Sequence, residues 1–200
     1  MPHYFDQNPQ SESQVRSFQT RIHGIDFEFA TDSGVFSRNR MDFGTELLIE
    51  TVIKDQQKMK GKLADLGCGY GPVGIVMKRA FPSLDVILCD VNSRALSLAR
   101  QNARSNQVAY LQIVQSDALA TVEGPLDYVL TNPPIRAGKA VVHRFFSEAW
   151  EKLAPDGLLY VVIQKKQGAP SALGKITELF GEAEVIERSA GYWIIRARKQ

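Results

Sequence analysis

Hydrophobic and polar residues alternate in two short segments near the start of the chain. The segments 18–22 and 25–29 flank His23-Gly24, and a two-residue turn with glycine between alternating runs predicts a β-hairpin. The next clear signal begins at Asp42, a suitable N-cap residue, which is followed by apolar residues at helical spacing that include Leu48. We therefore expect a hairpin and one helix before residue 62.

From residue 62 onward, short apolar runs alternate with helical patterns. The expected strands are 63–66, 86–89, 110–114, 126–131, 158–163, 185–187 and 193–197. The expected helices begin at Pro72, after a cap at Asn92 or Ser93, near Val141 and near Ala172. This alternation predicts an α/β fold with a Rossmann-like, doubly wound and mostly parallel seven-stranded sheet. A short turn, 189–192, joins the last two strands and predicts an antiparallel edge strand.

Length and composition fit one domain. The chain has 200 residues, of which 44% are hydrophobic and 23% are charged, and this usage is typical of a globular protein rather than a disordered one. We expect a loose arm over 1–15, a hairpin, cover segment and helix over 16–58, and a ligand-binding core over 62–200. The balance of 24 basic and 22 acidic residues leaves a net charge of +2, which is too small to indicate nucleic-acid binding by itself.

Membrane and secreted classes of protein are not expected. No apolar run approaches the ~20 residues that span a bilayer, and the first residues lack the pattern of a secretory signal. Two cysteines, Cys68 and Cys89, cannot form a disulfide framework, so we expect a reduced, cytoplasmic setting in which both are packing residues. The histidines show no metal-ligand spacing with the cysteines, and no metal site is expected.

The strongest chemical signal follows the strand expected at 63–66. Asp65-Leu66-Gly67-Cys68-Gly69-Tyr70-Gly71 places Gly67, Gly69 and Gly71 at alternating positions, so the backbone can turn sharply and approach a ligand without an intervening Cβ. The helix that starts at Pro72 is then expected to offer unpaired N–H groups to a carboxylate or phosphate. We interpret the segment as a nucleotide-binding loop, because a strand precedes it and a helix follows it.

A dinucleotide-binding protein is an alternative at this point. Residues 69–74 also match the G-x-G-x-x-G pattern, and Asp90 lies about where the acidic residue of such proteins is found. A nicotinamide-dependent oxidoreductase would fit that pattern. Two features disfavour it: Asp65 precedes the loop, where it can organise the glycines and a ligand amino group, and Asn132-Pro133-Pro134 has no evident role in hydride transfer.

The next two strands also end in carboxylates. Asp90 can accept hydrogen bonds from ribose hydroxyls, and Val91 and Asn92 follow it in the same loop. Asp117 can accept from the exocyclic amine of an adenine while a backbone N–H at Ala118 reaches a ring nitrogen. Helix capping and an ordinary loop are the structural alternatives. Because ligands bind beyond the carboxyl ends of the strands in such sheets, we expect one site there.

The strand expected at 126–131 ends in Asn132-Pro133-Pro134. An aromatic exocyclic amine is a poor nucleophile because its lone pair is delocalised into the ring. The side-chain oxygen of Asn132 and the carbonyl of Pro133 can accept from its two N–H groups, which favours pyramidal geometry and localises the lone pair. Prolines stiffen the backbone and preorganise these acceptors. We therefore assign Asn132, Pro133 and Pro134 to catalysis, with a strand terminator as the alternative.

Basic side chains gather after these strand ends and before the first helix. They are Arg136, Lys139, His143, Arg144, Lys165 and Lys166, together with Arg38 and Arg40. If they converge on the carboxyl ends of the strands, they form a phosphate-binding rim despite the small net charge. A solvated surface is the alternative for each residue alone.

In their order along the chain, these motifs resemble those of S-adenosylmethionine-dependent methyltransferases of the Rossmann-like class. More narrowly, the chain is similar to small-domain methyltransferases related to the bacterial enzyme that methylates guanine N2 in small-subunit ribosomal RNA. The segments that carry this narrower resemblance are 31–38, with Phe36 and Arg38, 41–45, and 132–139. The resemblance extends from the hairpin to the end of the chain.

The resemblance implies S-adenosylmethionine as cofactor and an amine as substrate. It implies that the cofactor is bound by Asp65, Gly67, Gly69, Gly71, Asp90, Val91, Asn92, Asp117, Ala118 and Asn132. The preferred substrate is a guanine in ribosomal RNA or a small-subunit particle, contacted by Phe36, Arg38, Ile135, Arg136 and Lys139. Three further hypotheses compete with this one: a protein glutamine amide as substrate, a DNA adenine as substrate, and a non-catalytic RNA-binding or assembly module.

Two departures from the family pattern affect the substrate side. The ribosomal RNA enzyme carries an additional N-terminal domain of similar size, for which this chain is expected to be too short. Many amino-methyltransferases of this kind also have an aromatic residue after Asn-Pro-Pro, where this chain has Ile135. Stacking on a base is therefore expected from elsewhere, with Phe36 or Arg136 as candidates.

Overall fold

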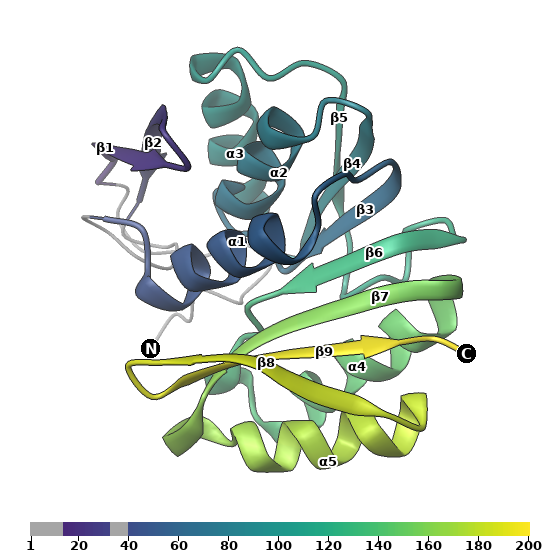
Figure 1. The fold of residues 1–200 in the computed structure, drawn as a ribbon. Helices are drawn as coiled ribbons and strands as arrows, with labels where there is room; N and C mark the ends of the chain where they lie inside the picture. The colour runs from purple at the N-terminus through teal and green to yellow at the C-terminus, as the bar shows by residue number, and fades with distance from the viewer. Residues whose placement is uncertain (1–13, 33–39) are drawn as a thin grey trace.

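The computed structural model describes residues 14–32 and 40–200, and Figure 1 shows their arrangement. The chain opens with the hairpin β1 (Arg16–Ile22) and β2 (Ile25–Thr31) and continues into helix α1 (Phe43–Asp55). The later strands are β3 (Gly61–Leu66), β4 (Leu84–Asp90), β5 (Leu111–Gln115), β6 (Leu126–Thr131), β7 (Leu153–Gln164), β8 (Ala183–Ser189) and β9 (Tyr192–Arg198). The later helices are α2 (Pro72–Ala80), α3 (Ser93–Ser105), α4 (Lys139–Lys152) and α5 (Ala169–Phe180), with 3₁₀ turns η1 (Ile135–Ala137) and η2 (Lys165–Gln167).

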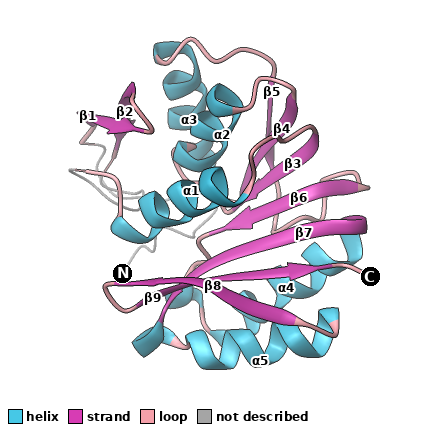
Figure 2. Cartoon of the chain, viewed as in Figure 1, coloured by secondary structure: helices cyan, strands magenta, loops and turns pink. Residues whose placement is uncertain are grey.

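The main sheet has seven strands in the order β5-β4-β3-β6-β7-β9-β8. Strands β3 to β7 run parallel to one another, and β9 runs antiparallel to both β7 and β8. The helices that connect the parallel strands lie on the two faces of the sheet, as Figure 2 shows. The predicted fold class is confirmed, and the reversed strand lies within the edge pair, one place in from β8.

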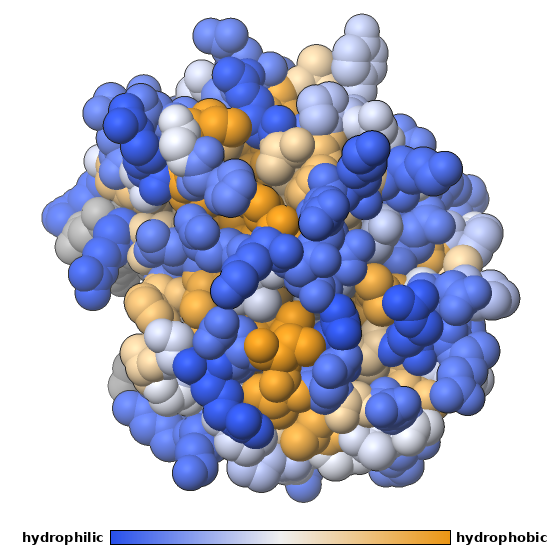
Figure 3. All heavy atoms as spheres, in the orientation of Figure 1, coloured by the Kyte–Doolittle hydropathy of each residue, from blue (hydrophilic) through white to orange (hydrophobic). Residues whose placement is uncertain are grey.

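Alternating side chains bury both faces of the sheet. Leu63 and Leu88 belong to one apolar core with α1, α2 and α3, whereas Ala64 and Val129 belong to a second core with α4 and α5. Full burial of one large aliphatic side chain stabilises a fold by roughly 1.5–3 kcal/mol, so these two cores hold the helices on the sheet. Apolar surface stays visible in Figure 3 over the β7–β9–β8 side, where no helix lies in front of the strands in Figure 1.

The N-terminal hairpin is attached to α3 through two asparagines one helical turn apart. The buried amide of Asn102 accepts from Ala30 N at 2.7 Å and donates to the carbonyls of Ala30 and Tyr70, both at 2.9 Å. Asn106 makes the same pair of bonds to Glu28, at 2.9 and 2.7 Å, at the surface. These side chains satisfy backbone groups of β2 as a neighbouring strand would.

The hairpin also contributes aromatic rings to the core. The rings of Phe18 and Phe29 lie 6.2 and 5.8 Å from that of Tyr70 in the glycine loop, and Phe27 stacks on Phe29 at 6.0 Å. Aromatic pairs at these separations add packing energy to the burial of their surface. The hairpin therefore packs against the loop expected to bind the ligand.

One strand begins earlier than the sequence predicts. β7 starts at Leu153 and runs through Pro155-Asp156-Gly157, residues that are typical of a turn. Asp156 adopts a φ of +64°, and the register against β6 shifts between Leu126 and Tyr128. The turn residues therefore form an irregularity inside a longer strand instead of ending the preceding helix.

Candidate functional site

Four strand ends meet at one edge of the sheet and bring the predicted motifs together. Leu66 at the end of β3 pairs with Cys89 on one side and with Thr131 on the other, and Asp90 pairs with Gln115. The residues that directly follow β3, β4, β5 and β6 therefore share this carboxyl edge. The expectation that the glycine loop, Asp90, Asp117 and Asn132 lie along one side of the sheet is confirmed.

The loop after β3 is a tight turn built on left-handed glycines. Gly67, Gly69 and Gly71 have φ values of +72°, +55° and +88°. The N–H groups of Gly67 and Cys68 both donate to the carbonyl of Cys89, at 2.9 and 3.0 Å, and fasten the loop to the neighbouring strand. A Cβ built on Gly69 would meet no atom of the described residues within 4 Å, so these residues leave space beside this part of the loop.

Asp65 occupies the amino end of α2, and this corrects one expectation from the sequence. Its carboxylate is 2% exposed and accepts the N–H of Gly74 at 2.9 Å, while Ile75 donates to Gly71 and Pro72 has no N–H to donate. The acidic group at this helix end is therefore Asp65 itself, not an external phosphate. A pyrophosphate would meet a buried carboxylate there, which disfavours dinucleotide binding.

The two acidic side chains at the first strand ends titrate abnormally. Burial raises the pKa of Asp65 to about 7, against the hydrogen bond from Gly74, and the nearby Asp90 raises it further. Burial also raises the pKa of Asp90, although N–H groups of Asn92, Gly69 and Val91 stabilise its charge. Two carboxylates beside the glycine loop make this edge of the sheet suited to hydroxyl and amino groups of a ligand.

Asp90 is held in place from both sides. Its Oδ2 accepts from Gly69 N at 2.8 Å and its Oδ1 from Asn92 N at 2.9 Å, and the carboxylate retains acceptor capacity for a ligand hydroxyl. The side chain of Asn92 is fully buried and caps α3 by accepting from Arg94 N and Ala95 N. Asn92 therefore acts on the predicted site through its backbone, by orienting Asp90.

The loop after β5 carries an ion pair that the sequence did not predict. Asp117 is exposed, and its carboxylate is bound by the guanidinium of Arg144 on α4, with one bond of 2.9 Å and a second, shorter one. Glu148, one turn further along α4, accepts from Leu119 N at 2.7 Å and fixes the same loop. Ala118 is buried with a φ of +50°. The predicted adenine contact at Asp117 would therefore share its carboxylate with Arg144.

Asn132 directly follows β6, whose last residue pairs with Leu66 at the start of the glycine loop. The hydroxyl of Thr131, which is fully buried, donates to the carbonyl of Leu66 at 2.8 Å and ties the end of β6 to the end of β3. The Nδ2 of Asn132 donates to Asp42 Oδ2 at 3.1 Å and to Thr45 Oγ1 at 3.0 Å. Within residues 14–32 and 40–200, no hydrogen bond is made to Asn132 Oδ1 or to the carbonyl of Pro133.

Of the residues predicted to contact the substrate, the structure describes those that come after Asn132 in the chain. Pro133 is buried, the carbonyl of Pro134 accepts from Ala137 N in η1, and Ile135 is half-buried against the α4–α5 core. Arg136 and Lys139 are exposed on η1 and at the start of α4, and Lys165 and Lys166 are exposed on η2. Phe36 and Arg38 lie outside the described residues.

Helix α1 contributes a group of residues that the sequence reasoning did not assign. Asp42 caps the helix, and Phe43 is 43% exposed with its ring 5.7 Å from that of Tyr192 at the β8–β9 turn. A Cβ on Gly44 would lie 2.8 Å from the Tyr192 ring, so this glycine allows the aromatic pair to form. The sequence signals here were the N-cap pattern at Asp42 and the segment 41–45 that carries the family resemblance, and neither of them indicated contacts with Asn132 or Tyr192.

Both cysteines are packing residues, as expected. Cys68 and Cys89 are buried and free, and burial raises the pKa of both thiols above the usual range. A protonated, enclosed thiol is a poor nucleophile. Within the part of the chain that the structure describes, no three His, Cys, Asp or Glu side chains form a group that could hold a metal ion, and no helix could cross a membrane.

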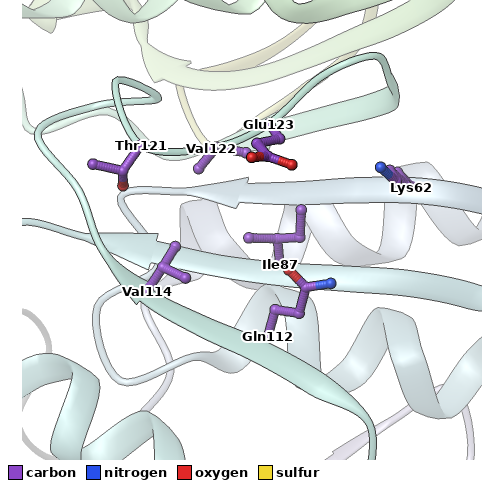
Figure 4. Close-up of a pocket in the computed structure, with 7 residues that line it drawn as sticks. All are labelled: Lys62, Ile87, Gln112, Val114, Thr121, Val122 and Glu123. Carbon is purple, nitrogen blue, oxygen red and sulfur yellow. The ribbon is translucent and has the colours of Figure 1, made fainter.

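A shallow hollow of about 210 Å³ lies elsewhere on the sheet, over β4 and β5. Figure 4 shows Thr121, Val122 and Glu123 on the loop above it, and Ile87 and Val114 on the strands below. Lys62 and Gln112 complete its lining. None of the predicted site residues lines this hollow, so it is separate from the carboxyl edge.

Residues 26–196 match the family model of the methyltransferase small domain. The chain belongs to this family. The matched segment contains the glycine loop, Asp90, Asp117 and Asn132, so the predicted resemblance is confirmed and the oxidoreductase alternative is wrong. The protein is a methyltransferase that depends on S-adenosylmethionine.

Several relatives are similar over most of this chain. It is 43% identical over 199 residues to the uncharacterized protein YbxB of Bacillus subtilis, and the match covers 98% of both chains. It is 30% identical over 151 residues to ribosomal RNA small subunit methyltransferase C of Photobacterium profundum, a match that covers 74% of this chain and 43% of that protein. The match to the same-named protein of Pasteurella multocida is 31% over 170 residues and covers 82% and 49%.

One solved structure resembles nearly the whole fold. It is the T. thermophilus 16S rRNA N2 G1207 methyltransferase, RsmC, in complex with AdoMet and guanosine. The TM-score is 0.81 at 25% identity, and the match covers 96% of this chain and 52% of that one. The chain therefore spans about half the length of the ribosomal RNA methyltransferases that it matches.

The residues at the carboxyl edge fit S-adenosylmethionine. The open space at Gly69 leaves room for a ligand against the loop, and the two held oxygens of Asp90 suit a pair of ribose hydroxyls. A buried carboxylate at Asp65 suits a cationic amino group nearby. The individual cofactor contacts remain predictions.

Proposed function

We propose that this protein transfers a methyl group from S-adenosylmethionine to the exocyclic N2 amine of a guanine in ribosomal RNA. The observation that carries the proposal is the pair of open acceptors, Asn132 Oδ1 and the Pro133 carbonyl, at the edge that holds the glycine loop. The names of the methyltransferase C relatives support small-subunit ribosomal RNA as the substrate, and the N2 G1207 activity and bound guanosine of the RsmC structure support guanine as the base. The proposed domain has a cofactor-binding catalytic core over 62–200, covered by 16–58.

In the proposed reaction, the residues of this chain act by alignment. The bound cofactor supplies an electrophilic methyl group on a positively charged sulfur. Asp65, the loop glycines and Asp90 hold the cofactor, with Asp117 and Ala118 at its adenine. Asn132 and Pro133 each accept one N–H of the target amine and turn its lone pair toward the methyl carbon. A bond forms between nitrogen and carbon, the carbon–sulfur bond breaks, and the amine releases one proton to solvent.

Alignment accounts for much of the expected rate. Holding two reacting groups at the right distance and angle can lower a barrier by about 7–11 kcal/mol, and preorganised acceptors add to this. No acid or base side chain is required, because the leaving group loses a charge as it departs. The stiff Pro133-Pro134 segment and the bond from Thr131 to Leu66 keep the acceptors fixed relative to the cofactor loop.

RNA contacts are proposed along the rim of the site. Arg136, Lys139, Lys165 and Lys166 are exposed where the strands end, and they supply positive charge for phosphates. Phe43 and Tyr192 supply the aromatic surface that Ile135 lacks. Phe36 and Arg38 remain predicted substrate contacts outside the described residues.

The function is tested with RNA from cells that lack the protein. The purified protein is incubated with this RNA, or with small-subunit particles from the same cells, and with S-adenosylmethionine that carries a labelled methyl group. The labelled nucleotide is then identified by digestion and mass spectrometry. We expect label on guanine N2 in small-subunit ribosomal RNA, and its loss in Asn132→Ala with cofactor binding retained.

Different results of that experiment would contradict the proposal. Label on a protein glutamine, on DNA adenine or on another RNA position would assign a different amine. No transfer to any of these, with tight RNA binding, would favour the non-catalytic assembly module. Unchanged transfer by Asn132→Ala would contradict the role of Asn132.

A further inference from the structure

The amide of Asn132 is clamped at its nitrogen by helix α1. Its Nδ2 lies 3.1 Å from Asp42 Oδ2 and 3.0 Å from Thr45 Oγ1, on a segment about 90 residues earlier in the chain. Thr45 is 5% exposed, so the contact with its hydroxyl is shielded from water. Both N–H groups of the amide are therefore used on the α1 side.

These contacts determine which end of the amide faces the site. An amide side chain has donors at nitrogen and acceptors at oxygen, whereas an ionised carboxylate only accepts. A flipped Asn132 would place its oxygen against the carboxylate of Asp42, which is repulsive, so the carboxylate determines the orientation of the amide. The oxygen must then point away from α1, where the residues that the structure describes leave it open.

We propose that Asp42 and Thr45 are positioning residues that hold the Asn132 amide with its oxygen toward the substrate amine. The proposal rests on the role given to Asn132 in the proposed function. It extends that role to two residues that do not touch the substrate and to a helix outside the cofactor core. A negative charge on the nitrogen side also polarises the amide and strengthens its oxygen as an acceptor.

Asp42 combines this contact with a second one. The same Oδ2 accepts the N–H of Thr45 at 3.1 Å and so caps α1. Serine, threonine and asparagine are also good N-caps, so the cap alone does not require a carboxylate. Serine keeps a capping oxygen on a shorter, uncharged side chain and removes the carboxylate beside Asn132, which allows the two roles of Asp42 to be separated.

The test uses four substitutions on α1 and its cap. Thr45→Val removes the hydroxyl acceptor with little change in shape, and Thr45→Ser restores it. Asp42→Ser keeps the helix cap and removes the carboxylate. Thr51→Val makes the same change as Thr45→Val six residues further along the same helix, at a second buried threonine, and is the matched control.

The first measurement needs no RNA. The side-chain NH₂ signal of Asn132 in a ¹H–¹⁵N NMR spectrum is assigned by its absence in Asn132→Ala. We expect Thr45→Val and Asp42→Ser to shift this signal and to speed its exchange with water, while Thr45→Ser and Thr51→Val leave it near its original position. An unchanged signal in both Thr45→Val and Asp42→Ser would overturn the clamp, whatever the substrate is.

The second measurement is methyl transfer to the RNA that the labelling experiment identifies. Misplacing a reacting group by about 1 Å can cost roughly 100-fold in rate, so we expect kcat to fall 10- to 100-fold in Thr45→Val and Asp42→Ser. Cofactor affinity and the KM for RNA should change less than about threefold, the scale of one weak surface interaction. Thr45→Ser should recover most of the rate.

The two measurements separate the clamp from the proposed function. A shifted Asn132 signal without methylation of any RNA would support the clamp and contradict the assigned substrate. Normal kcat in Thr45→Val and Asp42→Ser, with RNA methylation in the unsubstituted protein, would contradict the clamp. A fall in stability that matches the fall in kcat, and is shared by Thr51→Val, would reduce Thr45 to a packing residue.

Discussion

Asp65 is an acidic side chain in a place that excludes water. It is 2% exposed, it accepts one backbone N–H, and burial together with Asp90 raises its pKa to about 7. An ionised carboxylate in such a place costs free energy unless a cationic partner is present. Near neutral pH, Asp65 therefore exists both in a protonated form and in an ionised form that attracts a positive group.

The pH dependence of stability should report this balance. The folded protein holds a proton on Asp65 up to about pH 7, whereas the unfolded chain releases it near 3.8. Within that window the folded state binds more protons, so the free energy of unfolding falls as pH rises, by roughly 1.4 kcal/mol per unit at most, and stays low above it. Asp65→Asn still accepts from Gly74 and should lack this slope.

Denaturant unfolding of both proteins without cofactor, from pH 5 to pH 8, measures the effect. The difference between the two curves isolates Asp65 from the remaining titrating groups. Parallel curves would mean that Asp65 is ionised throughout this range. A smaller slope that vanishes in Asp90→Asn would place the proton on the pair of carboxylates rather than on Asp65 alone.

At the scale of elements, the hairpin and α1 pack beside the site and contact it through side chains. The hairpin is bound to α3 and to the glycine loop by Asn102, and α1 carries Asp42, Thr45 and Phe43 to the substrate side. Neither element belongs to the parallel sheet. Residues of either element can therefore be substituted without changing the order of the strands in that sheet.

Asn102→Ala should loosen the hairpin. It would remove the Asn102 side chain that bonds the N–H and carbonyl of Ala30 and the carbonyl of Tyr70, at a cost of roughly 3–9 kcal/mol, since each unsatisfied buried group costs roughly 1–3 kcal/mol. Asn106→Ala removes the same pair of bonds at the exposed Glu28 and should cost less than about 1 kcal/mol. Equal losses in denaturant unfolding would contradict the importance of burial here.

The Phe43–Tyr192 pair should act on substrate binding. Stacking on one base contributes roughly 1–3 kcal/mol, so Phe43→Leu and Tyr192→Leu should each raise the KM for RNA by about 5- to 100-fold with kcat little changed. Tyr110→Leu is the control, since Tyr110 is 92% exposed at the other edge of the sheet, before β5. Steady-state kinetics that show equal KM values for all three variants would exclude the pair from the substrate site.

At the scale of the whole molecule, the distribution of charge matters more than its sum. The net charge is only +2, yet four exposed basic residues lie at the end of the sheet where the site is, namely Arg136, Lys139, Lys165 and Lys166. Polyanions bind through local positive surface and release counterions when they do. This edge is therefore the expected RNA-binding side of the molecule.

The salt dependence of RNA affinity tests whether RNA binds at this edge of the sheet. Changing Arg136, Lys139, Lys165 and Lys166 together to glutamine should lower the slope of log affinity against log salt by about 0.7 for each phosphate that the protein no longer neutralises. Lys58→Gln with Lys60→Gln changes two exposed lysines between α1 and β3, at the opposite edge, and should leave the slope unchanged. Equal slopes for all three proteins would remove the rim from the RNA interface.

Much of this architecture was predictable because its signals are local. Alternation predicted the hairpin and the strands, and the cap at Asp42 and the proline at residue 72 predicted where helices begin, as the structure confirms. The long β7 was not predicted, because Pro155-Asp156-Gly157 favours a turn locally and only pairing with neighbouring strands keeps it extended.

By itself, the sequence determined the fold class, the order of the strand-end motifs and the methyltransferase family, because periodicity and motif order are properties of neighbouring residues. Only the tertiary structure decided how those motifs are held. Asp65 fills the end of α2, Arg144 binds Asp117, and Asp42 turns the amide of Asn132. Each of these contacts joins residues that are separated along the chain, so it depends on how the sheet and its helices pack.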